Sequence, residues 1–146
     1  MMAAGREKKL EYLVLASILA VLLLGILEAI GRLQRQIEEA AVLSEITALR
    51  VEILDRLSHR EVFGGMLPSG DNPVDWAGRR PMPYAGEMER APVEQGVWYF
   101  DTADRVLVFR SRHGADFRFR LMRADGRQQA PAVLAGVGLV RIDGGK

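Results

Sequence analysis

One uncharged apolar run, Tyr12 to Leu27, lies close to the amino-terminal end of the sequence and constrains the fold more than any other feature. Together with the flanking Leu10 and Ile30 it makes a segment of about 21 residues. At about 1.5 Å per residue, a helix of this length reaches about 31 Å, which is enough to cross the hydrocarbon core of a bilayer. No second run of this kind follows, so we expect a transmembrane helix over residues 10–30 and a single span.

A cleaved secretory signal peptide is the alternative interpretation of such a run. The apolar core of a signal peptide is usually shorter, about 7–15 residues, and leads to a cleavage site rather than to more helix. Here helix-forming sequence continues from Glu28 to about Arg60, so we favour a retained anchor.

The charges around the run predict its orientation. Arg6, Lys8 and Lys9 precede it, whereas the basic residues that follow it are interspersed with glutamates. The positive-inside rule then predicts that residues 1–9 are cytoplasmic and that the carboxyl-terminal part lies outside the cytoplasm.

Residues 31–60 have the pattern of an amphipathic helix that extends the anchor. Glu38, Glu45 and Glu52 recur every seven residues, and we place this acidic stripe on roughly the opposite side from the apolar residues. We expect the apolar stripe to pack on a domain and the acidic stripe to face water, with a contact to a neighbouring subunit as the alternative. The apolar stripe consists of Val42, Ile46, Leu49, Ile53 and Leu57.

Residues 61–95 show neither a helical nor a strand period. Gly64-Gly65 and several prolines end the helix, because glycine and proline favour turn dihedrals. We predict a long ordered loop, pinned by Trp76 and Tyr84.

Residues 96–146 contain β-rich segments separated by turn signals, including Asp101 to Asp104 and Asp125-Gly126. Short connections between consecutive strands favour antiparallel pairing, so the expected fold class is α+β, with the long helix packed on a small antiparallel β-meander. The predicted strands are Gly96 to Phe100, Val106 to Arg110, Phe117 to Arg123 and Ala132 to Ile142.

Signals for catalysis or cofactor binding are poor. The sequence has no cysteine, and its two histidines, His59 and His113, have no spacing that suggests a metal site or a nucleophile with its base. Asp101 and Asp104 are more simply hairpin residues than calcium ligands. We therefore expect no enzymatic activity, no cofactor and no metal.

The sheet region is rich in arginine, which raises the question of nucleic-acid binding. The net charge of the whole chain is only +1. We favour a solvated sheet face, or one complementary to the acidic helix stripe of a neighbouring subunit, over a nucleic-acid site. The arginines concerned are at positions 105, 110, 112, 118, 120, 123 and 127.

Together these features resemble the superfamily of type IV pilins and type II secretion pseudopilins. A basic amino terminus leads through Lys8-Lys9-Leu10-Glu11 into an apolar helix, then an amphipathic extension, a loop and a terminal sheet. Four further segments are similar to a bacterial branch of small pilin-like proteins, namely Asn72 to Trp76, Pro83 to Glu87, Gly96 to Asp101 and Leu107 to Arg110.

The region that the family's prepilin peptidase would process departs from the family pattern. That pattern has a glycine before the cut and a glutamate fifth in the mature chain. If Glu11 is that glutamate, the cut follows Arg6 and leaves Glu7 first, while Gly5 stands one place too early. Two interpretations stay open: an uncleaved pilin-like protein, or one with a degenerate site.

Glu11 is the candidate subunit-interaction residue. The resemblance implies that its carboxylate pairs with the amino-terminal ammonium of an adjacent subunit. The alternative is a hydrated residue at the membrane boundary beside Lys8 and Lys9.

The resemblance implies a structural subunit of a pilus or secretion filament that assembles through its amino-terminal helix. Its partners would be the inner membrane, other pilin-like subunits or copies of itself, and the assembly machinery. The alternative is a bitopic accessory or scaffold protein of an envelope complex that does not enter a filament.

Overall fold

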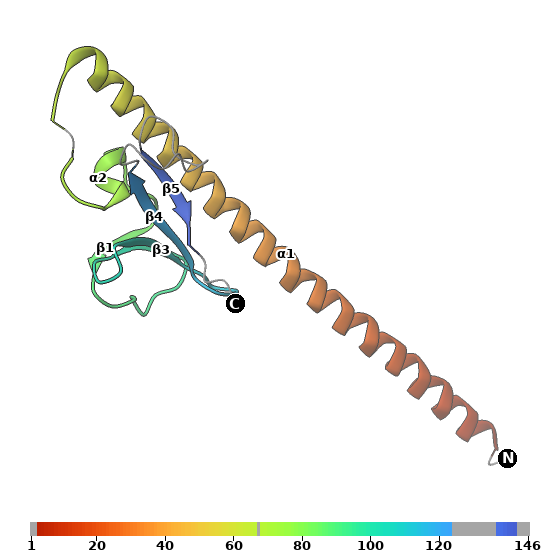
Figure 1. Ribbon diagram of the computed structural model, residues 1–146. Coiled ribbons are helices and arrows are strands. Elements are labelled where there is room, and N and C mark those ends of the chain that lie inside the picture. The colour runs from red at the N-terminus through yellow and green to blue at the C-terminus, as the bar shows by residue number, and fades with distance from the viewer. Residues whose placement is uncertain (1–2, 67, 124–136, 143–146) are drawn as a thin grey trace. The chain divides into compact units, whose positions relative to one another are not determined.

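The computed structural model describes residues 3–66, 68–123 and 137–142 of the chain (Figure 1). The chain divides into two compact units, an amino-terminal unit of Met1–Ile37 and a carboxyl-terminal unit of Glu38–Lys146. The first helix, α1 (Ala3–Phe63), contributes to both units. Each unit is described separately below.

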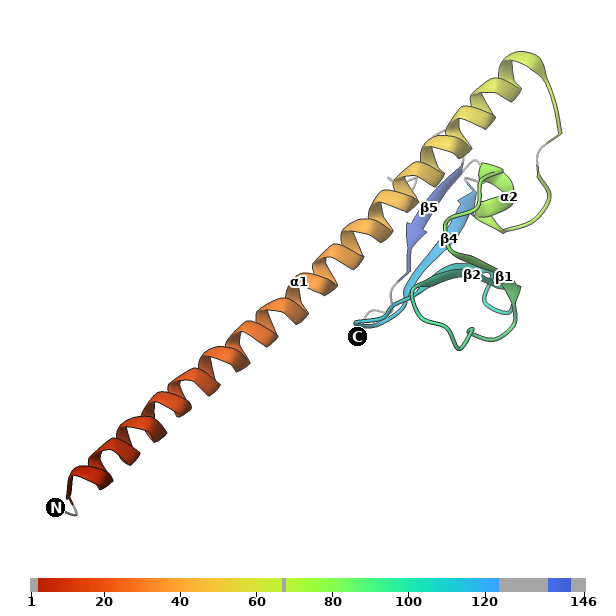
Figure 2. The ribbon, with the colours of Figure 1, turned by 180° about the vertical axis from the view of Figure 1, so that it is seen from behind.

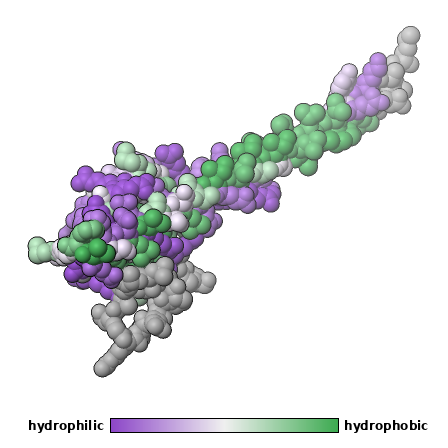
Figure 3. All heavy atoms as spheres, turned by 90° about the horizontal axis from the view of Figure 1, so that it is seen from above, coloured by the Kyte–Doolittle hydropathy of each residue, from purple (hydrophilic) through white to green (hydrophobic). Residues whose placement is uncertain are grey.

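The amino-terminal unit is the first part of α1. The Leu-, Ala- and Ile-rich sequence contains no proline, so nothing interrupts the backbone hydrogen bonds of the helix. The helix is long and apolar enough to cross a membrane, and its most apolar stretch is not buried by any other part of the described chain. Figure 3 shows this stretch as a continuous band of hydrophobic atoms. The expected spanning helix is therefore present by length and composition.

The carboxyl-terminal unit contains one five-stranded mixed sheet with the strand order β1-β2-β3-β4-β5. Strands β2 to β5 pair antiparallel with their sequence neighbours, as expected, which confirms the α+β class. The edge strand β1 pairs parallel with β2, so the sheet is not a purely antiparallel meander. The strands are β1 (Tyr84–Met88), β2 (Val97–Asp101), β3 (Val106–Arg110), β4 (Phe117–Arg123) and β5 (Val137–Arg141).

The segment predicted as an ordered loop contains β1 and a short helix, α2 (Pro73–Ala77). Asn72 caps α2, because its side-chain oxygen accepts a hydrogen bond from the backbone N–H of Val74 at 3.1 Å. Gly78 ends the helix with a φ of 61°, a left-handed conformation that suits glycine. The predicted turn at Asp125-Gly126 and the predicted strand residues 132–136 lie outside the described residues.

The second part of α1 packs on the sheet, as its apolar spacing predicts (Figure 2). Ile46 and Leu49 have no exposed surface, Ile53 retains 3 %, and Leu57 is partly buried at the edge of the same core. The sheet residues that complete this core include Trp98, Leu107, Phe119, Leu121 and Leu139. The opposite face of the sheet holds a smaller cluster of Tyr99, Val106 and Val108.

The connection between β2 and β3 is the predicted hairpin turn. The Asp101 side chain accepts hydrogen bonds from the backbone N–H groups of Ala103 and Asp104, at 3.0 and 3.1 Å. Arg105 then takes a positive φ of 55°. These contacts account for both aspartates as turn residues.

Candidate assembly surface on the long helix

The apolar part of α1 in the amino-terminal unit is exposed on every side. Leu13 is 63 % exposed, Val14 58 % and Leu15 59 %, and these consecutive residues point about 100° apart around the helix. A helix that is apolar all round is stable only where a bilayer or other helices surround it. This surface is therefore the first candidate for contact with lipid and with neighbouring subunits.

Glu11 lies on α1 between the exposed apolar side chains of Leu10 and Tyr12, which are 59 % and 70 % exposed. Within the described side chains, no ion pair or hydrogen bond engages its carboxylate. A carboxylate at the edge of an apolar helix is costly to take into hydrocarbon unless a positive group meets it. The pairing of Glu11 with a neighbouring subunit stays a prediction.

The processing region lies at the start of α1. Gly5, Arg6 and Glu7 belong to the first turns of this helix. Their side chains lie outside the described part of the structure, and whether the chain is processed there stays a prediction.

The acidic stripe does not lie opposite the apolar one, which corrects the expectation from the sequence. At about 100° per residue, Glu38, Glu45 and Glu52 lie only about 80° from the middle of the apolar stripe. They therefore flank the face that packs on the sheet. Two of the three are engaged within the carboxyl-terminal unit rather than facing water or a neighbour.

Glu38 anchors the β3–β4 connection to α1. Its carboxylate accepts a hydrogen bond from the Ser111 hydroxyl at 2.7 Å and one from the backbone N–H of Arg112 at 2.9 Å. Desolvation raises the pKa of Glu38, but these hydrogen bonds and the nearby His113 lower it more, so the net pKa lies below its ordinary value of 4.5. The carboxylate form is thus the form that holds this connection in place.

Two further carboxylates of α1 form ion pairs inside the same unit. Glu45 meets Arg79 at 2.9 Å and is the more buried partner, while Glu39 meets Arg141 at 2.9 Å. Among the described residues, the partner of Glu52 is Arg56, one turn further along the helix, at 3.9 Å.

Three arginines of the sheet region have acidic partners in the same chain. Arg105 and Arg123 both reach Asp71 at 3.3 Å, and Arg118 reaches Asp104 at 3.1 Å. Asp71 and Asp104 therefore balance part of the positive charge of this region, and a contact of the arginines with a neighbouring subunit or a polyanion stays a prediction. Arg127 lies outside the described residues.

A second exposed surface lies on the side of α1 turned away from the sheet. Ala40, Ser44, Thr47 and Val51 alternate at four- and three-residue steps and are all exposed, Val51 by 60 %. This spacing fits a seam between two helices, and small residues in it allow close approach. The four- and three-residue spacing of these residues is visible in the sequence, but only the apolar stripe was assigned a role there.

The histidines are not brought together. His59 stacks on Phe63 with ring centroids 4.6 Å apart, whereas the backbone N–H of His113 donates to the Ser111 hydroxyl in the β3–β4 connection. In the part of the chain that the structure describes, no group of three or more His, Cys, Asp or Glu residues could hold a metal ion.

Comparisons of this chain with protein-family models, with curated proteins and with solved structures find no match. The candidate surface therefore rests on the geometry of α1 and its charges.

Proposed function

We propose that this protein is a non-enzymatic, pilin-like structural subunit, anchored in the bacterial inner membrane with its carboxyl-terminal unit in the periplasm. It would assemble with other pilin-like subunits, or with copies of itself, into a filament of the type IV pilus or type II secretion kind. The observation that carries this proposal is the apolar first part of α1, whose exposed surface has no partner among the described residues. In a filament, neighbouring helices would replace lipid around it.

The two surfaces of α1 support this proposal in different ways. The exposed apolar part needs lipid or other helices on all sides. The seam of Ala40, Ser44, Thr47 and Val51 leaves one side of the packed part free for a second, parallel helix, because the sheet occupies the other side. Chains inserted with the same orientation in one membrane present this seam in parallel.

Filament recovery tests the proposal directly. Cells that express the chain at its native level are sheared, and the released filaments are separated from the membranes. We expect the chain in the sheared fraction together with pilin-like partners. Mass spectrometry of its amino terminus in both fractions would show at the same time whether the segment around Gly5, Arg6 and Glu7 is cut.

The second candidate function is a bitopic accessory or scaffold protein that stays in the membrane. The observation that favours it is the charge of Lys8 and Lys9, which stand where the resembling family has small or apolar residues at the start of its mature chain. Exclusive retention of the chain in the membrane fraction, with no trace in sheared filaments, would favour this function over the first.

A further inference from the structure

The exposed side of α1 in the carboxyl-terminal unit carries more than the four residues of the seam. Leu54 and Ser58 continue its three- and four-residue steps beyond Val51. At about 100° per residue, the middle of the seam lies about 150° from the middle of the apolar stripe that packs on the sheet. The seam therefore remains free while the opposite side of the helix is buried.

The same spacing continues toward the anchor. Four exposed residues precede Ala40 at three- and four-residue steps on α1, namely Ile37, Leu33, Ile30 and Ile26. From Ile26 to Leu54 the spacing repeats every seven residues for about four heptads, and a repeat of this length is typical of helices that pair along their whole contact.

No charged residue stands at a seam position. Ten of the thirty residues from 31 to 60 are Asp, Glu, Lys or Arg, yet none of them falls in the pattern from Ile26 to Ser58. The Thr47 hydroxyl donates to the backbone oxygen of Leu43 at 2.8 Å, so Thr47 can offer its methyl group to a neighbour. A long helix face without charge is the kind of surface that another helix covers.

The residues beside the seam match a second, parallel copy of this chain. In a parallel pair of heptad helices, a residue on one flank meets the residue five positions further along on the opposite flank of the partner. Here Arg50 would meet Asp55 of the second copy. One heptad earlier, Leu43 would meet Ala48. A positive group meets a negative one and a large side chain meets a small one, so the flanks are complementary in charge and in shape.

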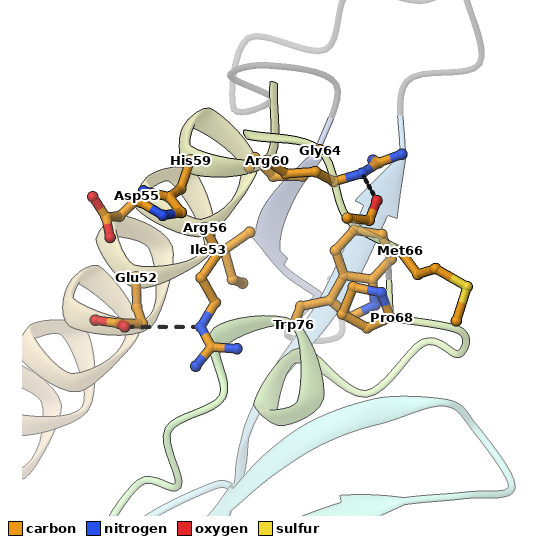
Figure 4. Close-up of a pocket in the computed structure, with 12 residues that line it drawn as sticks. Glu52, Ile53, Asp55, Arg56, His59, Arg60, Gly64, Met66, Pro68 and Trp76 are labelled. Carbon is orange, nitrogen blue, oxygen red and sulfur yellow. Dashed lines mark hydrogen bonds and ion pairs between the residues drawn. The ribbon is translucent and has the colours of Figure 1, made fainter. Parts of the chain in front are cut away.

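Both charged groups have capacity for this contact. The Asp55 carboxylate points away from Trp76 (Figure 4), and no ion pair or hydrogen bond engages it among the described residues. Arg50 donates through Nη2 to the backbone oxygen of Leu139 at 2.7 Å, while its Nε has no hydrogen-bond partner among the described residues. A guanidinium has five N–H donors, so Arg50 retains donors for a carboxylate.

We propose that two copies of this chain pair in the membrane through the seam, as a parallel and in-register helix dimer. Copies anchored with the same orientation present equal residues side by side, and confinement to one bilayer raises their effective concentration. This confinement compensates for the small apolar area of a seam that contains Ala, Ser and Thr. The inference rests on the proposed function for the membrane anchor and names the chain itself as the partner, whether or not a filament forms.

Cysteine cross-linking tests the pairing, because the native chain has no cysteine and every disulfide must involve an introduced one. Ala40→Cys, Ser44→Cys, Thr47→Cys and Val51→Cys are made one at a time in the full chain, and unsheared membranes are oxidised. Arg56→Cys, about 150° around the helix from the seam, is the matched control. We expect each seam variant to give at least about tenfold more disulfide-linked dimer than the control, since a disulfide needs Cα atoms within about 7 Å of each other.

The yields along the seam report the geometry of the pair. Cross-linking at all four positions supports parallel helices in register. Cross-linking at one position alone indicates two helices that only cross, and equal yields from seam and control variants indicate random collisions. A disulfide with a different protein in place of the dimer indicates another partner. Each of these last three results would overturn the proposal.

A change of charge tests the register. Asp55→Lys in the Ser44→Cys chain sets a like charge opposite Arg50 of the second copy, and we expect the yield of dimer to fall by about threefold or more. Glu94→Lys makes the same change of charge in the exposed β1–β2 connection and should leave the yield unchanged. Equal yields after the two substitutions would contradict the in-register dimer.

The dimer and the filament are tested in different fractions. Seam cross-links in membranes, with no chain in sheared filaments, would refute the filament and support the dimer. Recovery of the chain in sheared filaments, with no seam cross-links in membranes, would refute the dimer and leave the proposed filament function intact.

Discussion

Two stretches of the same helix, residues 12–27 and 42–57 of α1, contain eleven and eight Leu, Ile or Val residues and differ in burial. Leu13 and Val21 are 63 % and 68 % exposed, whereas Ile46 and Leu49 have no exposed surface. The first stretch is apolar in all directions, and the second concentrates its apolar residues on one side. The distribution of apolar residues around the helix, more than their number, separates a surface for lipid or other helices from a surface for a sheet.

The two stretches also differ in how they use charge. The first stretch has no charged residue between its ends, so a bilayer can surround it without desolvating an ion. Carboxylates beside the buried face of the second stretch tie it to the rest of the carboxyl-terminal unit, through Glu38 to the β3–β4 connection and through Glu45 to Arg79, which follows α2. Apolar contacts bury the helix, and these polar contacts fix which residues of the unit it meets.

The largest effect on stability is expected from a substitution on the buried side of the second stretch. Ile53→Asp places an unpaired carboxylate in the core between α1 and the sheet, and we expect it to cost more than about 4 kcal/mol and to unfold the carboxyl-terminal unit. Val51→Asp, two residues away on the exposed side, is the matched control and should change stability by less than about 0.5 kcal/mol. Thermal unfolding of the full chain, followed by near-ultraviolet circular dichroism, measures both. Similar melting of the two variants would show that burial of α1 against the sheet does not stabilise the unit.

The second prediction tests the sheet side of the same contact. Trp98 is 2 % exposed and lies 5.0 Å from Phe109 and 6.2 Å from Phe119, measured between ring centroids. Trp98→Ala removes this buried ring and should lower the free energy of unfolding by about 3–5 kcal/mol. Val93→Ala, at a side chain 95 % exposed, is the control and should be nearly neutral. Chemical denaturation gives both values. A decrease in the free energy of unfolding below about 1 kcal/mol for Trp98→Ala would indicate that neighbouring side chains move into the cavity.

Much of this fold follows from local patterns in the sequence. The three- and four-residue spacing from Val42 to Leu57 predicted the buried side of α1, because that face alone offers the sheet a continuous apolar surface. The four β-rich segments predicted β2, β3, β4 and the described part of β5, since β-branched and aromatic runs fit a half-buried pleated surface. In each case the spacing of the apolar residues and the turn-forming residues at the ends of the segment indicate the same element.

The elements that the sequence did not predict, α2 and β1, are short, and β1 depends on pairing with a strand elsewhere in the sequence. The five residues of α2 are too few for a helical period, yet Asn72 followed by Pro73 is a helix-start signal that could have found it. Strand β1 contains Gly86 at a φ of 108°, and only its parallel pairing with β2 makes it a strand. The acidic stripe was placed on the wrong side of the helix. A seven-residue spacing shows that the glutamates share one side, but it does not give the angle between that side and the apolar stripe. That angle follows from the rotation of about 100° per residue.

The third prediction concerns the polar contact at the start of the packed stretch. The folded pKa of Glu38 lies below 4.5, so its ionised form stabilises the unit at neutral pH, and this contribution is lost as pH falls from about 4.5 through the folded pKa. Glu38→Gln should lower stability at pH 7 by about 1 kcal/mol, because charged hydrogen bonds to Ser111 and Arg112 are replaced by weaker ones. Denaturation midpoints at pH 7 and pH 3 measure the difference.

Glu61→Gln is the control for this change, because Glu61 is exposed near the end of α1. The native chain and the control should lose more stability between pH 7 and pH 3 than the Glu38→Gln variant does. Parallel losses in all three would mean that the Glu38 carboxylate does not contribute through its ionisation.

The smallest effect on stability is expected in the exposed stretch, at Glu11. Because Glu11 has no partner among the described side chains and lies outside the carboxyl-terminal unit, Glu11→Ala should leave the unfolding of that unit unchanged. Membrane insertion should also persist, since deleting a charge makes the segment more apolar.

If Glu11 pairs with a positive group of a neighbouring subunit, the variant loses an attraction in a low-dielectric setting and leaves that group uncompensated. We therefore expect less Glu11→Ala protein in sheared filaments and less co-purification with pilin-like partners. Glu11→Gln should behave in the same way, because it keeps the size of the side chain and removes its charge, whereas Glu28→Gln, at the other end of the apolar run, should assemble normally. Native-level assembly of both Glu11 variants would assign Glu11 to a hydrated membrane boundary and would leave the apolar contacts of α1 to hold subunits together.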